Sequence, residues 1–174
     1  MNKGQRLWTL GVLVACVVGL LFAYKSLPAA KDKCGFIAEK GLVRYYDSET
    51  HEYLTGQQKV NGYWYMFAME GGAMVTGFYD HTEETNPNGG EKTCYYDEAG
   101  HMCYGQKYID GYWYNFGTGS GAMLTGFVEI PSQDKICYYD EQGHMLYGTQ
   151  VIKGKTYVFE EGTGALLDQS ENAE

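Results

Sequence analysis

The stretch "GYWYNFGTGSGAMLTGF", residues 111–127, indicates the fold, because almost the same stretch occurs once before in the 174-residue chain. Residues 62–78 read "GYWYMFAMEGGAMVTGF", so aromatic, glycine and methionine positions repeat at an offset of 49 residues. Self-similarity at a fixed period is typical of repeat architectures, in which each small unit buries its apolar face against its neighbours. We therefore expect a series of copies rather than one continuous core.

A recurring glycine separates the copies. In the dipeptides "TG" and "YG" it recurs in steps of 21, 28, 21 and 22 residues, at Gly56, Gly77, Gly105, Gly126 and Gly148. Each copy contains a short aromatic run, a turn, and a small residue or His followed by Met or Leu. The pattern gives six copies, which begin at Tyr45, Trp64, Tyr95, Trp113, Tyr138 and Thr156.

Each copy has the pattern of a β-hairpin. Aromatic runs of three or four residues have strand propensity, and segments such as "DEAG" and "GTGS" have turn chemistry. Asn-Gly and Asp-Gly in the linking segments predict a second turn. A lone hairpin is marginal in water, whereas stacked hairpins bury one another's aromatic side chains. The predicted fold class is therefore all-β, a solenoid of stacked β-hairpin repeats over residues 41–167, with a surface loop at residues 80–92.

The N-terminal residues have the pattern of an export signal. Two basic residues precede an uncharged 18-residue run, residues 7–24, which as a helix would be about 27 Å long and close to the hydrocarbon thickness of a bilayer. Residues 1–30 are predicted to be a signal-anchor transmembrane segment or a cleaved signal peptide, with the remainder outside the cell. A third alternative is a lipoprotein box ending at Cys16. Residues 31–40 are then a linker and residues 168–174 an acidic tail.

The exported part of the chain is strongly acidic. The formal charge of the whole chain is −9, but residues 35–174 carry 8 basic and 21 acidic residues, a net charge of −13. Such a surface repels phosphate backbones, so we expect no nucleic-acid partner.

The sequence predicts no catalytic activity. It contains no nucleophile elbow, phosphate loop or dinucleotide fingerprint, and no metal-ligand spacing. The repeated Asp97 and Asp140 stand where turns begin and where an Asp bonds its own backbone, which we favour over a catalytic carboxylate pair. His101 and His144 recur as "GHM" in place of "GAM", which favours a structural role. We expect no catalytic residue, no cofactor and no metal.

The motifs "GYWYxFxxxxGAMxTGF" and "VNGYWYMF" resemble the cell-wall-binding repeats of Gram-positive surface proteins and phage-type lysins. That superfamily includes choline-binding modules, glucan-binding YG repeats and the C-terminal repeats of large clostridial toxins. The resemblance covers residues 41–167 and implies ligand sites between successive hairpins. It also implies exposure on the extracellular face of a Gram-positive-type cell. The implied partner is a cell-wall polymer or exopolysaccharide, either a glucan or a choline-bearing teichoic acid, with the N-terminal segment contacting the membrane.

The resemblance also implies the ligand-binding residues. In choline-binding relatives a cage rich in Trp encloses a quaternary ammonium, and cation–π attraction is strongest with Trp. Here Phe replaces the Trp expected after "TG", and a Tyr-rich, Trp-poor set of repeats favours glycan over choline. The implied ligand-binding residues are Trp64, Trp113, Phe78, Phe127, Tyr95 and Tyr138. Because side chains alternate along a strand, about half of the tyrosines are expected to be packing residues instead.

The segment "CYYDEAGHMC", residues 94–103, raises the question of a disulfide. A four-residue turn from Asp97 to Gly100 would pair Tyr96 with His101, and hence Cys94 with Cys103, at a separation that a disulfide spans. The alternative is that both are buried free thiols.

Two functions from different classes follow. The first is a non-catalytic module that binds a wall polymer or polysaccharide in aromatic grooves. The second is a structural or adhesin-type surface protein, whose repeats bind a protein partner or form a stalk.

Overall fold

The computed structural model of the chain describes residues 34–86 and 89–171. The predicted signal segment, residues 1–30, lies outside this part of the chain. Among the described residues, no helix has the length and apolar character needed to cross a membrane.

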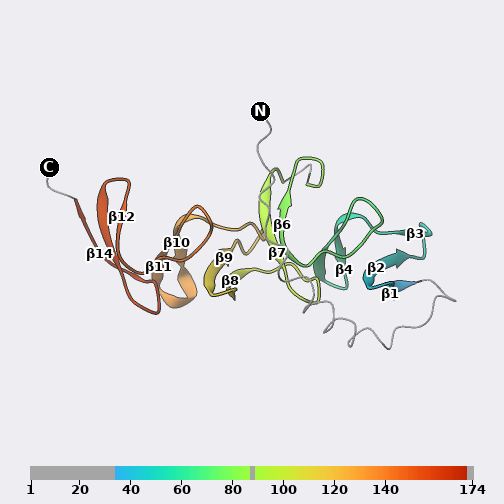
Figure 1. The fold of residues 1–174 in the computed structure, drawn as a ribbon, viewed down its shortest axis with the longest axis horizontal. Helices are drawn as coiled ribbons and strands as arrows, with labels where there is room; N and C mark the ends of the chain where they lie inside the picture. The colour runs from blue at the N-terminus through green and yellow to red at the C-terminus, as the bar shows by residue number, and fades with distance from the viewer. Residues whose placement is uncertain (1–33, 87–88, 172–174) are drawn as a thin grey trace. The chain divides into compact units, whose positions relative to one another are not determined.

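The described residues are almost entirely β-structure, which confirms the predicted all-β class (Figure 1). The strands of the N-terminal half are β1 Gly35–Glu39, β2 Leu42–Asp47, β3 Glu52–Tyr53, β4 Gly56–Val60, β5 Tyr63–Phe67, β6 Gly77–His81 and β7 Lys92–Tyr96. Those of the C-terminal half are β8 Gly105–Ile109, β9 Tyr112–Phe116, β10 Gly126–Ile130, β11 Lys135–Tyr139, β12 Gly148–Ile152, β13 Lys155–Phe159 and β14 Leu166–Glu171. A single 3₁₀ turn, η1 Pro131–Gln133, links β10 to β11.

Six hairpins are formed within the described ranges, and each pairs the strand before a predicted aromatic run with the strand that contains that run. The antiparallel pairs are β1–β2, β4–β5, β6–β7, β8–β9, β10–β11 and β12–β13, and β3 and β14 extend the first and last sheets. The array begins at Gly35, inside the predicted linker, and β14 runs into the predicted acidic tail. The long loop predicted at residues 80–92 is the connection between β6 and β7.

The β4–β5 and β8–β9 hairpins close at an Asn-Gly and an Asp-Gly turn. Asn61 and Asp110 have φ of 50° and 48°, and the glycines that follow them have φ of 89° and 92°. Positive φ at both central residues defines the two-residue turn whose twist matches that of paired strands. Asn, Asp and Gly adopt this conformation most readily, so the two dipeptides explain where the strands reverse.

The "DEAG"-type turns, in contrast, do not join two full strands. Tyr96 forms an isolated bridge with Met102, so the predicted pairing of Tyr96 with His101 is wrong. The reason is that Oδ1 of Asp97 accepts hydrogen bonds from the backbone amides of Ala99 and His101, at 2.9 and 2.8 Å. This compact turn holds His101, and the next residue makes the bridge.

The predicted Cys94–Cys103 disulfide is not present. Both residues are buried thiols, which was the alternative interpretation. Because Tyr96 faces Met102, the register places Cys103 against Tyr95, whose carbonyl accepts its amide at 2.8 Å. Burial raises the pKa of the Cys94 thiol to about 11, although Lys92 partly opposes the shift.

Two kinds of hairpin alternate along the chain. In the first kind, the opening glycine is followed by an aromatic residue, Phe36, Phe78 or Phe127. In the second kind, it is followed by a polar residue, Gln57, Gln106 or Thr149. We call these Phe-type and Gln-type hairpins. The offset of 49 residues therefore spans one hairpin of each kind.

The chain divides into two compact units. The first comprises described residues up to Tyr79 with residues 83–86 and 96–102, and the second comprises residues 80–82, 89–95 and 103–171. The core of the first unit is Val60, Tyr65 and Phe67, with Phe36, Tyr45, Leu54 and Met74 packed against it. In the second unit a core cluster is formed by Ile130, Cys137, Tyr139 and Met145, with Val128 and Tyr147 packed against it.

Methionines fill the space beside turn glycines, as predicted for gap-filling side chains. A Cβ added to Gly143 would lie 2.5 Å from Sδ of Met123. A Cβ on Gly100 would lie at the same distance from Sδ of Met74. A glycine is thus required at these turns by a close side chain as well as by its positive φ.

Candidate ligand-binding site

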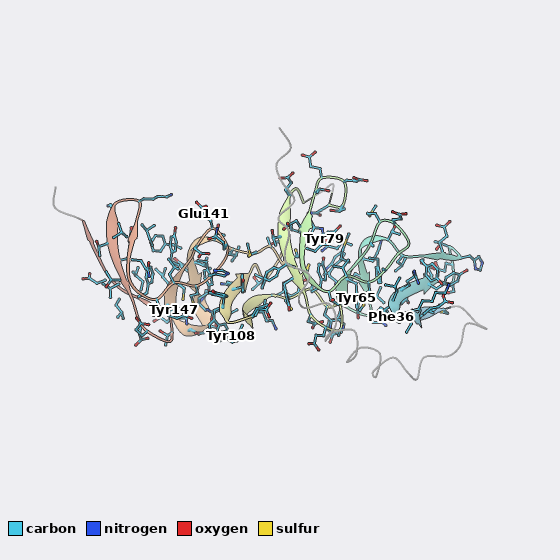
Figure 2. The ribbon with its side chains drawn as sticks, in the orientation of Figure 1. Phe36, Tyr65, Tyr79, Tyr108, Glu141 and Tyr147 are labelled. Atoms are coloured by element: carbon cyan, nitrogen blue, oxygen red, sulfur yellow. The ribbon has the colours of Figure 1, made fainter. Side chains whose placement is uncertain are left out.

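Each unit contains a cluster of three aromatic rings with the same geometry. In the first unit the Phe36 ring lies 5.0 Å from Tyr45 at 86° and 5.1 Å from Tyr65 at 53°. In the second unit the Phe127 ring lies 4.8 Å from Tyr138 at 77° and 5.0 Å from Tyr157 at 56°. We name them the Phe36 cluster and the Phe127 cluster; Figure 2 labels Phe36 and Tyr65.

Strand register explains how each cluster forms. Phe127 and Tyr138 are directly opposite across β10 and β11, so their side chains share one face of the hairpin. Tyr157 comes from β13 of the next hairpin and is buried. Phe127 remains 46% exposed. The cluster therefore has a buried base and an exposed ring between two successive hairpins, where the resemblance implied a ligand site.

Trp64 and Trp113 occupy equivalent places on β5 and β9. Each is 37% exposed, and each has a backbone carbonyl that accepts a hydrogen bond at 2.8 Å, from Met102 N and Met145 N respectively. Their rings have different neighbours. The Trp113 ring lies 5.5 Å from Tyr108, whereas Nζ of Lys59 lies 6.0 Å from the centroid of Trp64.

The structure does not bring all the predicted site residues together. Phe127 joins Tyr138, but within residues 89–171 no ring contact connects Trp113 with Phe127. The reason is that Phe127 packs on the following hairpin, whereas Trp113 belongs to the preceding one. Tyr95 contacts Phe116 at 6.1 Å, and Phe78 is half-buried on β6.

Sequence reasoning did not identify a second aromatic arrangement, built around the repeated histidines. The His144 ring stacks on Tyr112 at 3.9 Å and 14°, and its Nε2 lies 2.9 Å from the hydroxyl of Tyr114. Its Nδ1 lies 3.6 Å from Oδ2 of Asp140. Burial raises the pKa of Tyr114, so its hydroxyl stays protonated at neutral pH. The joint recurrence of "GYWY" and "GHM" was the signal that could have predicted this contact.

The same arrangement recurs in the first unit. The ring of His101 stacks on Tyr63 at 4.0 Å and 14°, and its Nδ1 lies 3.7 Å from Oδ2 of Asp97. Within the described part of the chain, no group of three or more His, Cys, Asp or Glu side chains could hold a metal ion. The two histidine rings stack on tyrosines that are 54% and 51% exposed, Tyr63 and Tyr112.

In the first two Gln-type hairpins, a partly buried amide bonds a tyrosine of the hairpin that follows. Nε2 of Gln106 donates to the hydroxyl of Tyr139 at 2.9 Å, and Nε2 of Gln57 donates to that of Tyr96 at 3.0 Å. Burial raises the pKa of Tyr139 to about 12. These polar contacts fix the packing of successive hairpins, because a buried hydroxyl without a partner would cost free energy.

The comparisons define the class of protein. No protein-family model matches the sequence, and no curated protein matches it. Solved structures do match, and they confirm the resemblance predicted from the motifs. The β-hairpin repeats of this chain are similar to those of choline-binding proteins.

Among the solved structures is choline-binding protein F from Streptococcus pneumoniae, 30% identical with a TM-score of 0.66, over 77% of this chain and 42% of that one. CbpJ from Streptococcus pneumoniae TIGR4 is 28% identical with a TM-score of 0.66, over 77% and 42% of the two chains. CbpF in complex with ipratropium is 32% identical with a TM-score of 0.62, over 72% and 37%. This chain thus spans about two fifths of the length of these relatives.

Proposed function

We propose that this chain is a non-catalytic binding module that attaches to a cell-wall polymer or exopolysaccharide through aromatic side chains between its hairpins. The observation that carries the proposal is that the Phe36 cluster and the Phe127 cluster have the same geometry, with ring distances that agree within 0.2 Å. Packing alone does not require the central ring of Phe127 to stay 46% exposed.

An exposed ring over a buried aromatic base suits two kinds of ligand. Its face attracts a quaternary ammonium by a cation–π interaction, and it can equally stack on the apolar face of a sugar ring. We favour a glycan, because Phe and Tyr attract cations less strongly than Trp does. The net charge of −13 over residues 35–174 favours a cation, so the choline of a teichoic acid is the ligand to test against it.

The similar proteins support a ligand in the cell wall. They are named as choline-binding proteins, and one structure of choline-binding protein F was determined in the presence of a peptidoglycan analogue. The corresponding location for this chain is the extracellular face of a Gram-positive-type cell. Residues 1–30 would then supply the signal or membrane anchor.

A retention experiment tests the proposal. The purified chain is applied to choline-agarose, immobilised dextran and purified cell walls, beside the variants Phe127→Ala and Val151→Ala. Val151 is an exposed apolar residue on β12 and serves as the matched control. Phe127→Ala should weaken retention roughly fivefold, the equivalent of about 1 kcal/mol for one aromatic contact, and Val151→Ala should leave it unchanged.

The tryptophans are tested in the same way. If Trp64 and Trp113 also contact the polymer, the double substitution to Ala should reduce retention more than either single change, because weak sites on one polymer gain through effective concentration. Circular dichroism confirms that the variants fold. If the wild-type chain is folded but is retained on none of the three supports, the binding proposal is refuted and the structural or adhesin-type alternative is favoured.

A further inference from the structure

The two tryptophan-bearing hairpins differ at one position that changes what each indole can bind. Lys59 stands opposite Trp64 across β4 and β5, and Tyr108 stands opposite Trp113 across β8 and β9. The two positions are 49 residues apart, so they are equivalent in the repeat. Exposure and backbone hydrogen bonding of the two tryptophans are the same. The difference therefore lies in the residue that shares the indole's face of the hairpin.

At Trp64 the chain supplies its own cation. Nζ of Lys59 lies 6.0 Å from the ring centroid, at the outer end of the range for cation–π attraction, which is about 0.5–1 kcal/mol at an exposed site. A ligand that stacks on Trp64 must displace this ammonium and forfeit the attraction. The aliphatic stem of Lys59 also follows the apolar surface, so less of the indole is available for contact.

At Trp113 the neighbour is another ring. Tyr108 is 63% exposed, and its ring lies 5.5 Å from the indole at 53°. These two tilted, exposed rings form an aromatic surface, and in the described part of the chain no Lys or Arg lies over either ring as Lys59 lies over Trp64.

Amide groups lie beside these rings. Gln106 is two residues from Tyr108 on β8 and therefore faces the same side. Its Nε2 already donates to Tyr139, so the exposed amide it bonds, that of Gln133, is the one that can meet a ligand. Nε2 of the exposed Gln133 donates to Oε1 of Gln106 at 3.0 Å. Amides donate to and accept from hydroxyl groups, whereas a quaternary ammonium has no hydrogen to donate to them. Aromatic rings with adjacent amides therefore suit a neutral sugar ring.

We propose that the Tyr108–Trp113 pair accepts the neutral sugar rings of a glucan-type chain, and that Lys59 keeps Trp64 from serving as a second such site. This inference rests on the proposed binding function and specifies its ligand class. It makes position 59 and position 108 the residues that determine which tryptophan-bearing hairpin binds.

Exchange of the two residues tests the proposal. The variants are Lys59→Tyr and Tyr108→Lys, and each new residue is already accepted at the equivalent position of the other hairpin. On immobilised dextran, Tyr108→Lys should weaken retention roughly fivefold and Lys59→Tyr should strengthen it. Trp113→Ala should weaken retention roughly fivefold and Trp64→Ala less than twofold.

A measurement without ligand tests the role of Lys59 separately. With Trp8 replaced by Phe in every protein, the Trp113→Phe variant leaves Trp64 as the fluorescent reporter, and the Trp64→Phe variant leaves Trp113. The ammonium of Lys59 should make Trp64 more sensitive to quenching by iodide, and less sensitive to caesium, than Trp113. Lys59→Gln should remove that difference. If the two tryptophans respond equally, Lys59 does not cover Trp64 and the inference is overturned.

The outcomes separate this inference from the binding proposal. Equal losses for Trp64→Ala and Trp113→Ala on dextran would overturn the inference and leave the binding proposal in place. Retention on choline-agarose but not on dextran would overturn the glucan assignment alone. Failure of the folded wild-type chain to bind dextran, choline-agarose and cell walls would overturn both.

Discussion

Acidification should destabilise the second unit through one buried histidine. His81, at the end of β6, is 2% exposed. Burial lowers its pKa to about 4, Lys92 lowers it further, and Asp80 opposes the shift. The unfolded chain has an ordinary histidine pKa of about 6.5 and binds the proton more readily. The stabilising contribution is therefore complete above pH 6.5 and is lost as the pH falls from 6.5 towards 4.

The size of the effect follows from those two pKa values. At pH 5 the unfolded histidine is almost fully protonated, while the folded one is about nine-tenths neutral, given the pKa of about 4. With about 1.4 kcal/mol for each pH unit between the two titrations, the free energy of unfolding falls by about 2 kcal/mol between pH 7 and pH 5.

Urea unfolding at pH 7 and pH 5, followed by circular dichroism, measures this loss. The matched variant is His81→Ile, because Ile130 occupies the equivalent position 49 residues on and is 7% exposed. Carboxylates and the other histidines are common to both proteins. The variant should therefore lose about 2 kcal/mol less than the wild type on acidification. An equal loss in the two proteins would refute the assignment to His81.

Two further changes test the packing and the thiols. Gly143→Ala should destabilise the chain by about 1–3 kcal/mol more than Gly111→Ala. Both glycines have positive φ, but only at Gly143 would the new Cβ meet Met123, at 2.5 Å. Equal midpoints of urea unfolding for the two variants would contradict this. Iodoacetamide at pH 8 should alkylate the exposed Cys34 in the native protein and Cys94 only after unfolding, because Cys94 is buried with a pKa of about 11. Mass spectrometry of timed samples measures the alkylation of Cys34 and of Cys94. Equally rapid alkylation of the two in the native protein would contradict the burial of Cys94.

Local sequence signals predicted the elements of the fold, and they succeeded where chemistry within a few residues decides the conformation. Asn61-Gly62 and Asp110-Gly111 specify tight turns by themselves, and the aromatic runs specify strands. Which strands pair to form each hairpin was harder to predict from the sequence. Asp97 begins a turn whether Tyr96 pairs with His101 or with Met102. The hydrogen bond that Asp97 accepts from His101 N decides for Met102.

The candidate site was predicted in part, for a similar reason. Cross-strand pairing places Phe127 beside Tyr138, and the repeat pattern contains that information. Which neighbouring hairpin Phe127 packs against depends on how successive hairpins turn relative to one another, a quantity that no short motif encodes. Tyr108 lies outside the repeated motif, and its contact with Trp113 depends on the register between β8 and β9.

The alternation of Phe-type and Gln-type hairpins limits how such a gene can change in length. In the second unit, Phe127 packs on Tyr157 of the next hairpin, while Gln106 bonds Tyr139 of the next hairpin. Loss of a single hairpin would place two hairpins of the same kind next to each other. The phenylalanine ring or the glutamine amide would then lose the tyrosine that it contacts in the hairpin that follows. Duplication or deletion of one Phe-type and one Gln-type hairpin together, 49 residues from Phe78 to Phe127, keeps both contacts, so the heritable module is a pair of hairpins.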